Sequence, residues 1–131
     1  MVNRERAETA IIEYFSTHKE DKHLQHGNTS MAIMPFAFAV EAAIAHSLGH
    51  GDAVSYRRLL AILHNYLGFR QQLDLASAFA EMREAMLPFA RALEPTLRRV
   101  LEILIKAEVV KKVGTGPFER SSFGFSEKME K

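Results

Sequence analysis

Six histidines are the side chains best suited to metal chemistry in this sequence. They are His18, His23, His26, His46, His50 and His64. His46 and His50 are four residues apart, a spacing that places both side chains on one face of a helix. However, Gly49 and Gly51 stand where that helix is expected to end, and a metal site needs three or four converging ligands. Because the chain also has no cysteine, we expect no bound metal.

Carboxylate pairs are the next candidates for chemistry. Glu81 and Glu84 are three residues apart, and Glu20 and Asp21 are adjacent in a polar segment. Neither pair has the apolar surroundings that raise a carboxyl pKa for acid–base catalysis. Gly114–Gly116 lacks the spacing of a phosphate-binding loop, and no serine lies in a nucleophile elbow. The sequence therefore predicts a protein that is not an enzyme and uses no cofactor.

Length and composition are those of an ordinary globular protein. The chain has 131 residues, of which 47% are hydrophobic and 25% charged, with a formal net charge of +1. This length suits one domain. Residues 1–8 are too charged for a signal peptide, and the longest apolar run, Met31–Val40, is too short to span a membrane. We therefore expect a cytoplasmic protein.

Apolar periodicity predicts a mainly α fold, a bundle of about five helices with a C-terminal β-hairpin. The expected helices are Arg4–Thr17, Met31–Leu48, Asp52–Leu67, Phe69–Leu87 and a fifth that starts at Pro95. The polar segment His18–Ser30 is expected to be a loop. Residues 1–51 would form an N-terminal helical part and residues 52–131 a second part, packed together as one compact domain.

The helix expected at Met31–Leu48 is apolar on all sides, and after Pro35 only Glu41, His46 and Ser47 interrupt it. Such a helix must be buried all round. In a chain this small, only a compact bundle or a second subunit can cover it that fully, and we expect a second subunit to cover part of it. The predicted homodimer interface consists of Phe36, Val40, Ile44 and Leu48.

The C-terminal region contains the clearest amphipathic helix, and after it the spacing of apolar residues changes from that of a helix to that of a strand. Apolar residues recur at helical spacing in the fifth helix, at Leu97, Val100, Leu101, Leu104 and Ile105. After Ala107, β-branched residues and the alternation around Phe123 and Phe125 indicate two short strands. A loop containing glycine and proline separates them, so the pattern predicts a β-hairpin.

This region resembles a winged-helix domain. Phe89–Leu93 matches a short helix, Glu94–Thr96 a turn, Leu97–Leu104 a recognition helix, and Lys106–Val113 the approach to a two-stranded wing. The chain has Leu93-Glu94-Pro95 where such motifs usually have a glycine-containing turn. The resemblance covers the last third of the chain and implies a DNA-binding regulator, although winged helices also serve as protein-interaction modules.

Charge is distributed unevenly along the chain. Residues 1–53 hold four Lys+Arg and seven Asp+Glu, a net of −3, whereas residues 95–131 hold eight and five, a net of +3. Basic charge thus gathers where the recognition helix and wing are expected. Contacts between Lys or Arg and phosphates supply most non-specific affinity for nucleic acids.

These observations favour a small protein that binds duplex DNA, a transcriptional regulator or DNA-architecture factor acting as a homodimer. The residues expected to contact DNA are Thr96, Arg98, Arg99, Lys106, Lys111, Lys112 and Arg120. The alternative is a non-enzymatic adaptor that uses the same surface to bind a protein in a larger assembly. A third class is a small metalloenzyme that uses the histidines.

Overall fold

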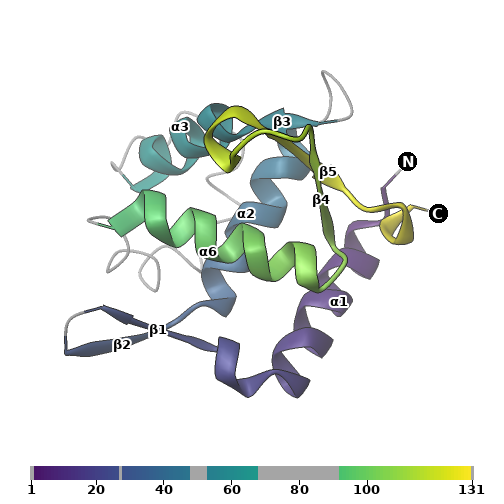
Figure 1. Cartoon of the computed structure of the whole chain (residues 1–131). Helices are drawn as coiled ribbons and strands as arrows, with labels where there is room; N and C mark the ends of the chain where they lie inside the picture. The colour runs from purple at the N-terminus through teal and green to yellow at the C-terminus, as the bar shows by residue number, and fades with distance from the viewer. Residues whose placement is uncertain (1, 27, 48–52, 68–91, 131) are drawn as a thin grey trace.

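The computed structural model describes residues 2–26, 28–47, 53–67 and 92–130, and four α-helices lie within them (Figure 1). The first, α1, spans Arg4–Thr17, as the sequence predicted. Asn3 caps it, because its side-chain oxygen accepts a hydrogen bond from the Arg6 N–H at 3.1 Å. The buried face of α1 consists of Ala7, Ile11, Tyr14 and Phe15.

The segment after α1 is more ordered than the predicted polar loop. A single 3₁₀ turn, η1 (Lys19–Asp21), leads into the antiparallel strands β1 (His23–His26) and β2 (Thr29–Ala32). The expected loop at His18–Ser30 was therefore wrong. Leu24 pairs with Met31 in the hairpin, and Met31 is buried, so two apolar side chains among polar neighbours hold it to the core. The hairpin extends away from the helices at the lower left of Figure 1.

The central helix α2 spans Met34–Ser47 and contacts α1, α3 and α6. It begins at Met34, next to Pro35, because Thr29–Ala32 belongs to β2. Phe36, Val40 and Ile44 are each 0% exposed within the single chain. The burial that suggested a second subunit is thus provided by the chain itself, while Leu48 lies outside the described residues. The homodimer remains a prediction, without the observation that first motivated it.

The elements that follow α2 in the chain include α3 and α6, and both pack against α2. Strand β3 (Val54–Ser55) runs directly into α3 (Tyr56–Leu67), and α6 spans Leu93–Lys106. The sequence placed the start of this last helix at Pro95, but Pro95 lies in its first turn, where a missing N–H breaks no helical hydrogen bond. The predicted helix Phe69–Leu87 lies outside the described residues, as do residues 89–91 of the short helix in the winged-helix match. Glu94–Thr96, predicted as the turn of that match, belongs to α6, so the prediction of a turn there was wrong.

The C-terminal hairpin is present, as the sequence predicted. Strands β4 (Val110–Val113) and β5 (Ser122–Phe125) pair antiparallel, with Val110 opposite Phe125 and Val113 opposite Ser122. The turn η4 (Phe118–Arg120) lies between them. The sequence did not predict β3, which pairs with β5 through Val54 and Phe123 and gives a sheet of order β3-β5-β4.

Both parts of the chain share one hydrophobic core, which includes Ile11 of α1, Ile44 of α2, Leu101 of α6 and Phe123 of β5. The chain ends lie side by side in Figure 1, where the Asn3 N–H donates to the Met129 carbonyl at 2.8 Å beside the last turn, η5 (Glu127–Met129). None of the helices in the described ranges has the length and apolar character needed to cross a membrane.

Candidate nucleic-acid interface

The outer face of α6 carries three of the basic residues predicted to contact DNA. Arg98, Arg99 and Lys106 have side-chain exposures of 44%, 37% and 59%. The opposite face, including Leu97, Val100, Leu101 and Leu104, is fully buried. The helical phase predicted from the apolar spacing therefore agrees with the structure.

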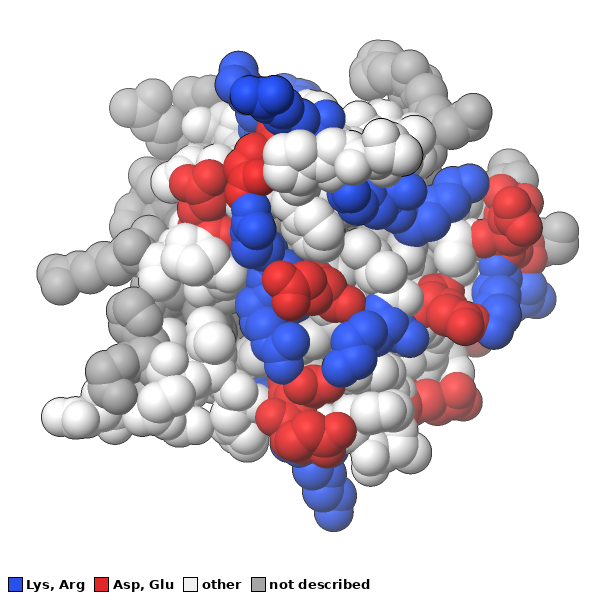
Figure 2. Space-filling model, in the orientation of Figure 1, with Lys and Arg blue, Asp and Glu red and all other residues white. Residues whose placement is uncertain are grey.

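Carboxylates from other elements lie against each of these cations. Arg98 forms an ion pair with Glu119 of η4, and an Arg99 nitrogen lies 2.6 Å from an Asp21 oxygen. The Lys106 ammonium lies 3.7 Å from the other Asp21 oxygen. In Figure 2, Lys and Arg alternate with Asp and Glu across this face of the molecule. The basic charge that gathers in this part of the sequence is therefore offset on α6 by nearby carboxylates.

Asp21 is the centre of this arrangement. It is buried, and one oxygen accepts a hydrogen bond from the Tyr14 hydroxyl at 2.6 Å while the other accepts from Arg99. The hydrogen bond from Tyr14 and the nearby Arg99 and Lys106 charges hold the pKa of Asp21 below its usual value. Burial and the Asp21 carboxylate raise the pKa of Tyr14 to about 12. The N-terminal part of the chain thus supplies a stable negative charge to the outer face of α6.

Thr96 does not lie where the sequence placed it. Because α6 begins at Leu93, Thr96 falls on the buried stripe that also contains Leu97 and Val100. The residue is 1% exposed, and its hydroxyl oxygen has no hydrogen-bond partner. A side chain buried in this way cannot contact a phosphate or a base edge in this structure.

The hairpin carries the remaining predicted residues, Lys111, Lys112 and Arg120. In the described part of the chain, none of the three forms an ion pair. Lys111 and Arg120 are exposed, and the Lys112 ammonium lies 5.8 Å from the centre of the Phe118 ring. Arg98 approaches the same ring at 5.6 Å, so cation–π contacts orient two basic side chains around Phe118.

Two further basic residues lie at the start of α3. Arg57 and Arg58 are exposed in the first turn of that helix and form no ion pair with any described residue. The turn η4, which contains Arg120, packs against α3. The sequence showed two adjacent arginines there but gave no sign that α3 and the hairpin loop meet.

The buried carboxylate of Glu41 is the other ionisable group that stands out. An oxygen of Glu41 lies 3.0 Å from Arg4, and the second oxygen has no hydrogen-bond partner. Burial raises the pKa of Glu41 to about 7, against the opposing effect of Arg4. Glu41 is 0% exposed, so no substrate can reach it in this structure.

The histidines are spread over separate elements. His23 belongs to β1, His46 to α2 and His64 to α3, while His50 lies outside the described residues. Among the residues that the structure places, no three His, Cys, Asp or Glu side chains are grouped closely enough to hold a metal ion. The predicted i, i+4 pair of His46 and His50 thus lies partly outside the described residues.

Comparisons of the chain with protein-family models, with curated proteins and with solved structures give no significant match.

Proposed function

We propose that the protein binds duplex DNA as a small regulator or DNA-architecture factor, and that the hairpin makes the main phosphate contacts. The observation that carries this proposal is the contrast in pairing between the hairpin and α6. Lys111, Lys112 and Arg120 remain free of carboxylate partners within the described residues, whereas each cation on the outer face of α6 has one. Unpaired cations can release counterions from DNA without first breaking an internal ion pair.

The order of elements supports the same proposal. Helix α6 is followed directly by the β4–β5 hairpin, the order that the winged-helix resemblance implies for a recognition helix and its wing. Phosphate contacts of this kind fix position and orientation but carry no sequence information. We therefore expect binding to duplexes of any sequence, with weak preferences.

The mixed charge of the outer face of α6 favours a second candidate function, the adaptor. Alternating Arg98, Glu119, Arg99 and Asp21 charges suit a protein surface of complementary pattern better than a polyanion. In that case the protein would show no affinity for duplex DNA.

The test is a fluorescence-anisotropy titration of a short random-sequence duplex at about 50 mM and about 200 mM salt. The logarithm of the binding constant falls linearly with the logarithm of the salt concentration. Each phosphate contact contributes about −0.9 to the slope of this line, so three contacts predict a slope near −3. The variant Lys111→Gln/Lys112→Gln should lose most of this dependence. Lys19→Gln/Lys22→Gln removes the same net charge from η1 and the residue after it, and should bind like the wild type. Equal losses in both variants would mean that only net charge matters and would contradict the proposed surface.

A further inference from the structure

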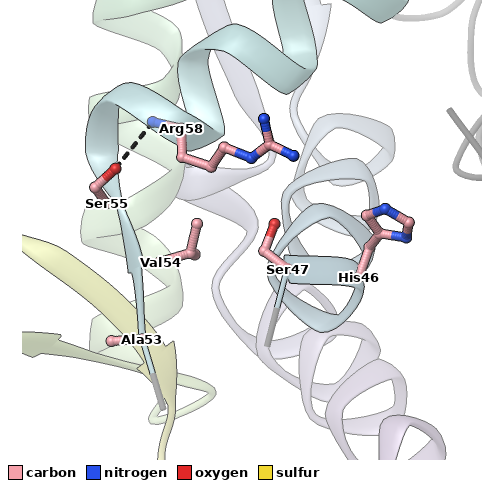
Figure 3. A pocket seen from close by; sticks show the side chains of 6 residues that line it. All are labelled: His46, Ser47, Ala53, Val54, Ser55 and Arg58. Carbon is pink, nitrogen blue, oxygen red and sulfur yellow. Dashed lines mark hydrogen bonds between the residues drawn. The ribbon is translucent and has the colours of Figure 1, made fainter. Parts of the chain in front are cut away.

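A cavity of about 240 Å³ lies between the end of α2 and the start of α3 (Figure 3). It is separate from the outer face of α6. Its described lining residues are His46, Ser47, Ala53, Val54, Ser55 and Arg58. None of these is acidic, and four carry polar side chains. The volume lies below that of pockets for drug-sized ligands, so it admits only a small molecule or ion.

The Ser47 hydroxyl is an unmatched polar group at this cavity. Its oxygen is buried and has no hydrogen-bond partner. An unpaired buried hydroxyl is costly, and native structures usually satisfy it with a protein group, a water or an ion. In Figure 3 this hydroxyl points toward the Arg58 side chain across the cavity. Because this oxygen is covered in the structure, a group bound in the cavity contacts it after a rotation of the Ser47 side chain.

Arg58 brings positive charge to the same space. Its side chain extends from α3 toward the last turn of α2, and its guanidinium forms no ion pair with any described residue. Its backbone N–H donates to the Ser55 hydroxyl oxygen at 3.1 Å. Ser55 thus keeps its own hydrogen available for donation. The described lining combines a guanidinium, two hydroxyls and the His46 imidazole, a set rich in donors and without a carboxylate.

We propose that this cavity binds a phosphate group, held by the Arg58 guanidinium and the Ser47 hydroxyl. A guanidinium presents paired N–H donors that match two oxygens of a phosphate, and a charge-assisted hydrogen bond is about twice as strong as a neutral one. Ser47 donates to a third oxygen and so gains the partner that it lacks. The site is independent of the proposed DNA surface and is tested without DNA.

The experiment is a titration of the uniformly labelled full chain, followed by proton–nitrogen correlation spectra at constant ionic strength. The probes are inorganic phosphate and glycerol phosphate, with chloride as the reference anion. We expect saturable shifts of the Ser47 amide and of the amides from Ala53 to Arg58 with phosphate and not with chloride. Tighter binding of glycerol phosphate would identify a phosphomonoester as the occupant, and tighter binding of inorganic phosphate would identify the free ion.

Adjacent arginines on α3 provide a matched pair of variants. Arg58→Gln should weaken phosphate binding by about tenfold, because a charge-assisted hydrogen-bond pair is lost. Arg57→Gln removes the same charge one residue away, outside the described lining, and should leave the affinity unchanged. Ser47→Ala should also weaken binding, with an unchanged thermal melt as evidence that the protein folds. Equal effects of the two arginine variants, or equal shifts with phosphate and chloride, would overturn the proposal.

Discussion

The outer face of α6 and the β4–β5 hairpin carry the same types of basic residue within one short stretch of sequence, but they differ in surroundings. Arg98, Arg99 and Lys106 each form an ion pair with a carboxylate, whereas Lys111 and Arg120 form none with any described residue. The total charge of a segment therefore does not measure the positive potential that a ligand encounters. That potential depends on which distant residues the fold brings close.

Distance along the sequence explains why this difference is hidden before folding. Asp21 is 78 residues away from Arg99 and reaches it only because α1 and η1 pack beside α6. Glu119 reaches Arg98 from the loop between β4 and β5. The difference between the outer face of α6 and the hairpin therefore depends on which face of α6 is buried. The variant Leu101→Ala, with the largest expected effect, tests this orientation.

Leu101→Ala should lower the free energy of unfolding by roughly 2–5 kcal/mol, because Leu101 is 0% exposed and its loss leaves a cavity. Glu102→Ala, on the outer face, should change it by less than about 0.5 kcal/mol. Denaturant melts of both variants give the two values. The reverse ranking would mean that the two faces of α6 have been exchanged.

Glu41 and Asp21 should affect the pH dependence of the unfolding free energy in opposite directions. Burial raises the pKa of Glu41 from 4.5 to about 7, so the folded protein favours its neutral form. The stability that the neutral carboxyl contributes is present in full below about pH 4.5 and is lost as the pH rises through about 7, a change of about 3 kcal/mol. Asp21 has a lowered pKa, so its contribution is present above pH 3.8 and is lost at lower pH.

The variant Glu41→Gln isolates the first of these effects. It should flatten the decline in unfolding free energy between about pH 5 and about pH 8, measured by denaturant melts across that range. A decline as steep as that of the wild type would mean that Glu41 is charged in the folded protein, as Asp21 is. Burial alone would then not distinguish the two carboxylates.

Asp21→Asn should leave Arg99 and Lys106 on the outer face of α6 without the Asp21 carboxylate, so that they resemble the unpaired cations of the hairpin. The loss of charge-assisted hydrogen bonds should cost about 1.5–3 kcal/mol of stability, which a denaturant melt measures. The same change frees Arg99 and Lys106 for phosphates, so affinity for duplex DNA should rise and its salt dependence should steepen. Weaker DNA binding by a folded Asp21→Asn protein would show that Asp21 does not mask these cations.

Local sequence signals predicted the parts of the fold that local interactions determine. The bounds of α1 and the C-terminal hairpin follow from periodicity, and both are present. The β1–β2 hairpin was missed because its only apolar pair, Leu24 and Met31, is separated by polar residues. Strand β3 has two residues and exists only through its pairing with β5, which no local pattern indicates.

The sequence predicted which basic residues form the candidate interface but not which of them form ion pairs with carboxylates. The sequence identified Arg98, Arg99 and Lys106 as outward-facing, but their carboxylate partners come from packing between distant segments. Thr96 was misplaced because the sequence put it in a turn before the helix, whereas it lies within α6, four residues before Val100 on the buried stripe. Small shifts in the start of a helix therefore change which side chains are available to a ligand.

The measurement that tests the central claim most directly compares salt slopes for duplex binding in two double variants. Lys111→Gln/Lys112→Gln should reduce the slope by about 1.8, or about 0.9 for each lost phosphate contact. Arg99→Gln/Lys106→Gln, which removes the same charge from the paired face of α6, should reduce it by less than about 0.5. A larger loss from the α6 variant, or a wild-type protein that binds no duplex at about 50 mM salt, would contradict the account.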